Sequence, residues 1–280
     1  MANHRIHSHR KLAINGQTPG GTTVVSLTQG WANIISSSPD GNIVATRDRL
    51  TAMQSGSFAT EDFALAMAIL TGDMADLTIN GRESNSDTYL KHTIKNPVIT
   101  SLALTIRQNQ FAGLACDFIS KFTGPTATFA DMYVVERAIE TEPAKATANR
   151  GGLEFVTTVH GSQSILHMLD LSFSMQIPVI VKANDGEIGY CTVDQIMEGL
   201  TPSGSITFED TGTDVANLTS TLLAAARGNL VATTKSSGGA ANKVVTIAGV
   251  EFTQASTDFS SRPDMTAQRM SYIVTDNATT

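Results

Sequence analysis

The chain has 280 residues, 41% of them apolar and 16% charged, and its formal net charge is −7. This length and apolar fraction supply one large core or two ordinary ones, which excludes wholesale disorder. The acidic balance counts against a protein that grips nucleic acid, because counterion release requires clustered Lys and Arg, which this chain lacks beyond a short N-terminal run. The low share of charge suits a protein whose surface is partly covered by other subunits.

A basic run, HRIHSHRK, lies at the N-terminus. His4, His7 and His9 could hold a zinc or nickel ion, but no carboxylate or Cys lies near them. Because chain ends are usually mobile, we expect residues 1–10 to form a flexible arm and not a metal site. The N-terminus has no apolar run of seven or more residues, as a signal peptide would, and no run in the chain approaches the roughly 18 apolar residues of a membrane helix. We therefore expect a protein made in the cytosol, with no membrane partner.

The first half of the chain predicts a turn, a strand and a helix, in that order. Asp40-Gly41 is typical of a tight turn, and the segment SGSFATED begins at Ser55. Apolar residues recur at helical spacing in EDFALAMAILTGD, which Gly72 ends. The segment DLTI, from Asp76, and two alternating segments, PVITSLALTIRQ and FAGLACDFISKF, predict strands.

A joint follows between Glu136 and Gly152. Its sequence, ERAIETEPAKATANRGG, is charged, poor in large apolar residues, and interrupted by Pro143 and a glycine pair. This composition predicts a linker between two domains.

The segment ILHMLDLSFSMQI, over residues 165–177, is the clearest strand pattern. Apolar and polar residues alternate with period 2 over its whole length, and Pro178 interrupts pairing after it. Its predicted apolar set is Ile165, His167, Leu169, Leu171, Phe173, Met175 and Ile177. Its predicted polar set is Asp170, Ser172, Ser174 and Gln176. We expect one face of this strand to be buried and the other to meet water.

The second half then repeats the elements of the first. Asp185-Gly186 predicts another turn, and SGSITFED, from Ser203, alternates with Ile206 and Phe208 on one face. The segments NLVA, KVVTIAGVEFTQ and AQRMSYIVTD predict strands in the same order as before.

A helix is predicted between these strands, in TDVANLTSTLLAAARGN. Val215, Leu218 and Leu222 share one face of it. Thr213 can cap its start and Gly228 can end it.

Two copies of one domain account for this repeated order. The segments SGSFATED and SGSITFED begin 148 positions apart. The predicted organisation is an arm over 1–10, copy 1 over 11–135, a linker over 136–152 and copy 2 over 153–280. Each copy is expected to be mainly β, a sandwich or barrel-forming antiparallel sheet with one packed α-helix. Uncovered edges of such sheets pair with other chains, so pairing could pass from copy to copy and from subunit to subunit.

This order of elements resembles the tail-tube fold of long-tailed bacteriophages. The nearest match runs through Asp185-Gly186 and the segment SGSITF, which begins at Ser203. The first copy keeps the start of that segment, but Ala59 stands where the second copy has Thr207. By element order, the resemblance covers most of both halves.

The resemblance implies a structural virion protein, made in the host cytoplasm, that assembles into stacked rings. These rings would form the tail tube through which DNA is ejected. Two domains per chain imply a homotrimeric ring with pseudo-sixfold symmetry in preference to a hexamer. The implied partners are further copies of the chain and the terminator, tape-measure and baseplate proteins, while DNA passes without specific binding.

A lumen for DNA should carry acidic or neutral polar groups, since positive charge would hold the phosphates. The polar set of the long strand is therefore the candidate lumen face: Asp170, Ser172, Ser174 and Gln176. If rings stack, the arm supplies the candidate contacts between them: His4, Arg5, His7, His9 and Arg10.

No residue pattern predicts catalysis or a cofactor. The segment HGSQS contains Ser162 and Ser164 but not the GxSxG pattern of a hydrolase. Cys116 and Cys191 stand alone and are typical of small buried hydrophobes. Trp31, the sole Trp, is expected in the core or at a subunit interface.

Two pairs of carboxylates, Glu61-Asp62 and Glu209-Asp210, could bind calcium but better suit the starts of the predicted helices. We therefore expect no metal site and no enzyme. The alternatives to a tail tube are a tail terminator, a baseplate hub or a capsid decoration protein. A non-catalytic ligand-binding β-sandwich comes after these.

Overall fold

The described part of the computed structural model is mainly β, with one helix. The described residues are 12–14, 17–18, 23–33, 36–37, 43–44, 49–62, 76–82, 89–95, 97–120, 133–138, 144–145, 151–183, 191–195, 200–209, 213–224, 227–236, 242–258 and 267–275.

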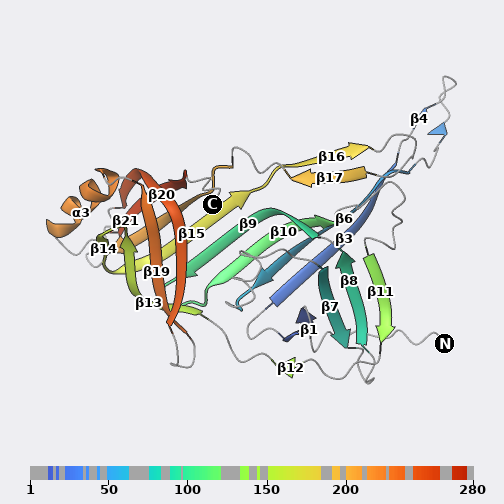
Figure 1. Cartoon of the computed structure of the whole chain (residues 1–280), viewed down its shortest axis with the longest axis horizontal. Coiled ribbons are helices and arrows are strands. Elements are labelled where there is room, and N and C mark those ends of the chain that lie inside the picture. The colour runs from blue at the N-terminus through green and yellow to red at the C-terminus, as the bar shows by residue number, and fades with distance from the viewer. Residues whose placement is uncertain are drawn as a thin grey trace.

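Eleven strands form one antiparallel sheet that runs through both halves of the chain (Figure 1). Their order is β14-β13-β19-β20-β21-β18-β15-β9-β10-β6-β3. The bounds are β3 Thr23–Asn33, β6 Arg49–Thr60, β9 Pro97–Arg107, β10 Gly113–Ser120, β13 Gly151–His160, β14 Gln163–Ile165, β15 Met168–Gln176, β18 Ser203–Glu209, β19 Gly228–Ser236, β20 Asn242–Asp258 and β21 Ala267–Val274. Because β15 of the second half pairs with β9 of the first, the two halves share this sheet.

A second sheet, of six strands, has the order β11-β8-β7-β1-β2-β12. Its strands are β1 Leu12–Ile14, β2 Gln17–Thr18, β7 Asp76–Arg82, β8 Tyr89–Lys95, β11 Tyr133–Ala138 and β12 Ala144–Lys145. All its pairs are antiparallel except that of β12 with β2. Two small hairpins and the helix complete the described elements: β4 Ser36–Ser37 with β5 Ile43–Val44, β16 Val179–Ala183 with β17 Cys191–Gln195, and α3 Thr213–Ala224.

We call the eight strands β20-β21-β18-β15-β9-β10-β6-β3 the shared sheet. One of its faces is buried, because apolar and polar residues alternate along the strands. On β9, for example, Leu102, Leu104 and Ile106 are buried while Arg107 is exposed.

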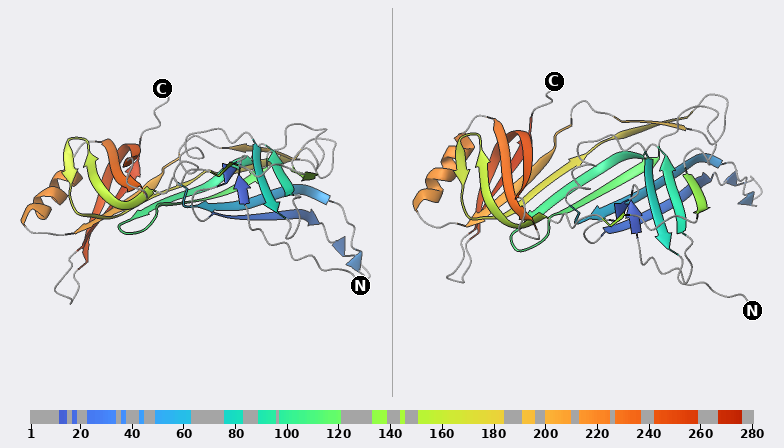
Figure 2. Two further views of the ribbon diagram at one scale, coloured as in Figure 1. Left: turned by 90° about the horizontal axis from the view of Figure 1, so that it is seen from below. Right: turned by 60° about the horizontal axis from the view of Figure 1, so that its bottom comes forward.

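Strands from both halves cross this buried face. In Figures 1 and 2, β7 and β8 lie across β3 and β6, and β13 and β19 lie across the other end of the shared sheet. Leu77 and Ile94 from the first pair and Leu230 from β19 join the same buried cluster as Leu104. The core therefore lies between the shared sheet and these crossing strands.

Both halves pair their strands in the same order. The first half contributes β9-β10-β6-β3 to the shared sheet, and the second contributes β20-β21-β18-β15. Beside them, β2-β1-β7-β8 corresponds to β14-β13-β19-β20. The second half has the single strand β20 where the first has β8 and β9, and β20 bends at Gly249, whose φ is 67°. Pro97 opens β9 at the corresponding place, since proline cannot donate to a ladder.

The residue register agrees between the halves as well. Ser26 lies opposite Ser57 in the first half, and Ser172 lies opposite Ser205 in the second. Each of these pairs joins the strand beside the SGS strand, β3 in the first half and β15 in the second, to that SGS strand. The tandem duplication stays a prediction, and the common strand order and register support it.

A β-bulge also recurs at the corresponding place. It leaves Thr100 of β9 without an opposite residue on β10, and Thr253 of β20 without one on β21. A bulge bends its strand and increases the local twist, so both halves of the shared sheet curve at the same point.

The central glycine of each SGS segment leaves room for an aromatic ring to pack against the strand, in the space that a side chain would fill. Gly56 lies opposite Phe118, and Gly204 lies opposite Tyr272. A Cβ at Gly204 would lie 2.1 Å from the backbone oxygen of Ser172, and one at Gly56 would lie 2.5 Å from the Phe118 ring. The Tyr272 hydroxyl reaches that same Ser172 oxygen and donates a hydrogen bond of 2.6 Å. Burial raises the pKa of Tyr272 above its usual range.

The predicted single strand over 165–177 is wrong in its extent. β14 ends at Ile165 and β15 begins at Met168, because His167 takes a φ of 53° and turns the chain. A register shift beside Leu169 follows, and Met168 is the buried residue there. From Leu171 onward the predicted alternation is confirmed.

The two SGS strands and the second helix are confirmed, but α3 ends at Ala224, and Gly228, the predicted helix end, is the first residue of β19. Ile206 and Phe208 are fully buried on one face of β18, and α3 packs its buried Leu222 against the core. No helix in the described ranges is long and apolar enough to cross a membrane. Glu209 ends β18 four residues before α3, so the helix-start role predicted for it is wrong.

Several expectations fall on residues outside the described ranges. These are the arm over 1–10, the body of the first predicted helix over 63–73, and the turns at 40–41 and 185–186. The strands that flank the second turn, β16 and β17, pair antiparallel as a hairpin requires. The predicted linker over 136–152 contains β12 and the adjoining ends of β11 and β13.

Candidate assembly surface

The four candidate lumen residues lie on β15, between β18 and β9 in the shared sheet. Asp170, Ser172, Ser174 and Gln176 all lie on the face opposite the buried Leu171. Ser174 and Gln176 are exposed, whereas Asp170 and Ser172 are partly covered. The structure therefore brings the four predicted residues together on one surface.

This surface continues over the neighbouring strands, and we call it the polar face of the shared sheet. It follows the register of the strand pairs from β20 to β3. Its further members include Ser26, Ser57, Ser101, Thr105, Arg107, Asp117, Ser203, Ser205, Thr207, Gln254, Arg269 and Ser271.

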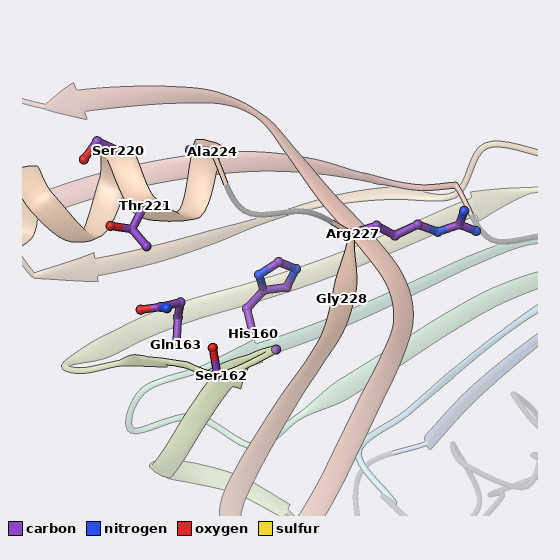
Figure 3. Close-up of a pocket in the computed structure, with 9 residues that line it drawn as sticks. His160, Ser162, Gln163, Ser220, Thr221, Ala224, Arg227 and Gly228 are labelled. Carbon is purple, nitrogen blue, oxygen red and sulfur yellow. The ribbon is translucent and has the colours of Figure 1, made fainter.

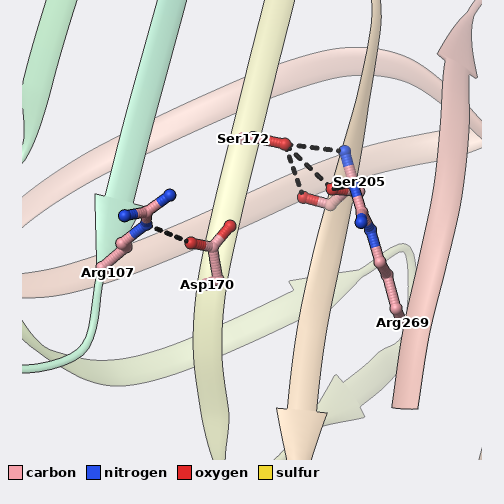
Figure 4. A network of polar contacts seen from close by, with 5 residues as sticks. All are labelled: Arg107, Asp170, Ser172, Ser205 and Arg269. Atoms are coloured by element: carbon pink, nitrogen blue, oxygen red, sulfur yellow. Dashed lines mark hydrogen bonds and ion pairs between the residues drawn. The ribbon is translucent and has the colours of Figure 1, made fainter. Parts of the chain in front are cut away.

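Side chains of the polar face bond across the strands (Figure 4). The Arg107 guanidinium donates to the Asp170 carboxylate at 2.9 Å, across the junction between the two halves. The hydroxyls of Ser172 and Ser205 are 3.0 Å apart, and Arg269 donates to the Ser205 hydroxyl at 3.4 Å. These contacts fix neighbouring strands in register without burying charge.

The charge of the polar face is mixed and slightly acidic among the described residues. Its carboxylates are those of Asp117, Asp170, Glu209 and Glu251, and its guanidinium groups are those of Arg107 and Arg269. Arg107 is paired with a carboxylate, so the described side chains of this surface offer no cluster of free positive charge to phosphates.

Sequence reasoning missed Arg107, Arg269 and Asp117 on this surface. Each lies in a segment of apolar and polar alternation, LTIRQ, AQRMSYI and LACDFI, from which the sequence predicts only a strand. The alternation could have placed them on a polar face, but only pairing shows that it is the same face as that of Asp170.

The shared sheet has one long open edge. β3 pairs with β6 along Thr23–Asn33, and no other described strand pairs with it. Trp31, the sole Trp of the chain, lies on this strand, where the sequence predicted a core or interface residue.

A second open edge lies on β20. Its first part pairs with β19 and its second part with β21, up to Asp258 opposite Ala267. On the side away from β21, the backbone over 254–258 has no partner among the described strands. Unpaired strand edges are templates for pairing with another chain.

A pocket of about 650 Å³ lies apart from this surface, between the β13–β14 turn and the C-terminal end of α3 (Figure 3). Its lining includes His160, Gln163 and Thr221. His160 is buried, and its Nε2 lies 3.0 Å from the backbone oxygen of Val250. Its Nδ1 has no hydrogen-bond partner among the described residues.

The residues considered for catalysis or metals are scattered. Ser162 and Ser164 are exposed at the β13–β14 turn, and Asp170 is engaged with Arg107 on the polar face. Within the described ranges, no three His, Cys, Asp or Glu side chains lie close enough to share a metal ion. Cys116 is buried as predicted, and burial, with the neighbouring Asp117 carboxylate, raises the pKa of its thiol to about 12.

No protein-family model matches the chain, and no curated protein matches it in sequence.

Proposed function

We propose that this chain is a structural protein whose copies join edge to edge into rings. The rings stack into the tube of a phage tail, which conducts DNA without binding it. One observation carries the proposal: the two halves already join into one sheet through β15 and β9, and among the described strands that sheet still has open edges at β3 and β20. A sheet that is extended within the chain in this way can be extended again between chains.

The two faces of the shared sheet support a tubular assembly. One face is buried by the crossing strands, and the other carries polar residues on each of the eight strands, beside a row of alanines in the first half. A closed sheet removes its edges and must turn one face inward. The inward face of a DNA conduit should let the DNA phosphates pass without holding them, and a surface of mixed, slightly acidic charge suits this role.

The tail-tube resemblance implies six domain places around each ring. If each half fills one of six places around the ring, three chains close it with pseudo-sixfold symmetry. The further partners of such a tube are terminator, tape-measure and baseplate proteins, and its location is the virion after synthesis in the host cytoplasm.

Negative-stain microscopy of the purified protein at rising concentration tests this proposal. The expected result is a dispersed subunit when dilute, and rings and long tubes when concentrated or seeded. Single rings that never elongate would favour a terminator. A subunit that stays single at every concentration would overturn the proposal, and a gain in thermal stability with a small ligand would then favour a binding module.

A further inference from the structure

The internal junction shows how one half of the chain joins the other. Residues 170–176 of β15 pair antiparallel with residues 101–107 of β9, in seven successive pairs. The backbone ladder continues one step beyond them, where the Ile177 N–H donates to the carbonyl of Thr100 at 2.8 Å. Thr100 is the residue that the bulge leaves without an opposite residue on β10, so the bulge marks the end of the junction.

β3 occupies in the first half the place that β15 occupies in the second. Ser26 of β3 and Ser172 of β15 hold the same register position against the SGS strand beside them. Counting along the strands, Trp31 corresponds to Ile177. β15 uses its outer edge to pair with β9, whereas the outer edge of β3 is open among the described strands.

The C-terminal part of β20 occupies the place of β9. The recurring bulge aligns Thr253 with Thr100, and therefore Gln254 with Ser101. The edge of β9 beyond the bulge receives β15, and the same edge of β20, over 254–258, is open among the described strands. Within one chain, this junction forms once, between β15 and β9. The open edges of β3 and β20 are the equivalent two edges, left without each other's partner.

We propose that β3 of one subunit pairs antiparallel with residues 254–258 of the next subunit, in the register of the internal junction. This inference rests on the proposed function and names its subunit contact. In this register, the Trp31 N–H donates to the Thr253 carbonyl of the neighbour. The expected pairs are Gly30 with Gln254, Gln29 with Ala255, Thr28 with Ser256, Leu27 with Thr257, and Ser26 with Asp258.

The contact is heterologous, because one edge of each subunit meets the other edge of its neighbour. Such contacts close a ring when the rotation between subunits is right and otherwise grow a filament. The ion pair of the internal junction is not repeated, since Val24 stands where β15 has Asp170. The contact between subunits therefore depends on the backbone ladder, which has five residue pairs where the internal junction has seven, and this suits a subunit that stays dispersed until it is concentrated.

Engineered disulfides test the register. The background is the full chain with Cys191→Ser, in which Cys116 remains buried. Single variants Thr28→Cys and Ser256→Cys are mixed in equal amounts, concentrated until rings form, oxidised, and run on a non-reducing gel. The expected result is a covalent two-chain product in the mixture and none in either single variant alone. The double variant should give covalent ladders.

Two control pairs calibrate this experiment. Ser174→Cys with Ala103→Cys joins residues that lie opposite each other in the internal junction, so it should close a disulfide within one chain. Ser26→Cys with Gln254→Cys lies four residues out of the proposed register, about 13 Å away at 3.3 Å per residue, and should not crosslink.

The outcomes separate the junction from the function. Rings that crosslink through Thr28→Cys and Ser256→Cys support the proposed register. Rings that form without this crosslink, while the internal control closes, overturn the junction and leave the tube proposal standing. No rings and no crosslink between chains, with the internal control closed, overturn both.

Discussion

The two halves of the shared sheet pair their strands alike but carry different residues on the polar face. In the first half, one row of residues across β9, β10 and β6 consists of Ala103, Ala115 and Ala59. The corresponding row of the second half contains Arg269 and Thr207 and leads to the Asp170–Arg107 ion pair.

The aromatic position beneath the glycine differs as well. Phe118 in the first half corresponds to Tyr272 in the second, which adds a hydroxyl bond to a backbone oxygen. The comparison teaches that backbone register and close packing define this fold, while surface charge and single hydroxyl groups can vary. Substitutions at corresponding positions should therefore rank by how much they disturb the backbone.

The largest effect is expected where a Cβ would meet backbone. Gly204→Ala places it 2.1 Å from a backbone oxygen, and Gly56→Ala places it 2.5 Å from the Phe118 ring. We expect losses in the free energy of unfolding of about 3 kcal/mol and about 2 kcal/mol respectively, since overpacking strains strands that cannot move apart. Gly113→Ala has open space around it and is the matched control. Urea unfolding measures all three, and equal effects at 204 and 113 would refute the packing argument.

Alkali should destabilise the protein through one buried group in each half. The pKa of Cys116 is raised from 9.0 to about 12, and that of Tyr272 is raised above its usual 10.0. The folded state thus favours the protonated forms, so stability is intact below pH 9 and falls as pH rises beyond it. We expect a loss on the order of 2 kcal/mol by pH 11. Cys116→Ala and Tyr272→Phe should each flatten this slope, and an unchanged slope in both variants would refute the assignment.

Exchanging the aromatic residues should have a smaller effect. Tyr272→Phe removes a hydrogen bond to the Ser172 backbone oxygen and should cost about 1 kcal/mol. Phe118→Tyr makes the first half resemble the second and should cost less than this or stabilise the protein. Thermal unfolding of both variants measures the difference, and a larger loss for Phe118→Tyr would show that the two sites are not equivalent.

The smallest effect is expected at the ion pair. Asp170→Asn should cost about 0.5 kcal/mol or less, because Arg107 is mostly exposed and solvent screens the pair. The loss should shrink in high salt. A loss of several kcal/mol that salt does not change would mean that the charge pair holds the two halves together.

The sequence predicted the local elements better than the way they pair. Alternation identified Ile206 and Phe208 as core residues of β18, because a strand with one solvent-exposed face has an apolar residue at every second position. The same period of two continues through His167 and Leu169, so it does not reveal the turn and the register shift there, and the predicted strand is too long. The pairing of β15 with β9 joins residues far apart in the chain. No local sequence pattern predicts such a pairing.

The polar face was predicted in part for the same reason. Its four residues on β15 share one strand, and alternation placed them together. Arg107 and Arg269 come from other strands and reach this face through sheet register alone. The repeated SGS segment gave the best indication of that register, since its glycines hold the same position in both halves.

The most direct test of the account is the mass of the smallest closed particle as the protein is concentrated, measured by native mass spectrometry. Extension of one sheet from chain to chain, with the six places per ring that the tail-tube resemblance implies, predicts a change from a single chain to a ring of three. A single chain at every concentration, or a dimer that never grows, would contradict it.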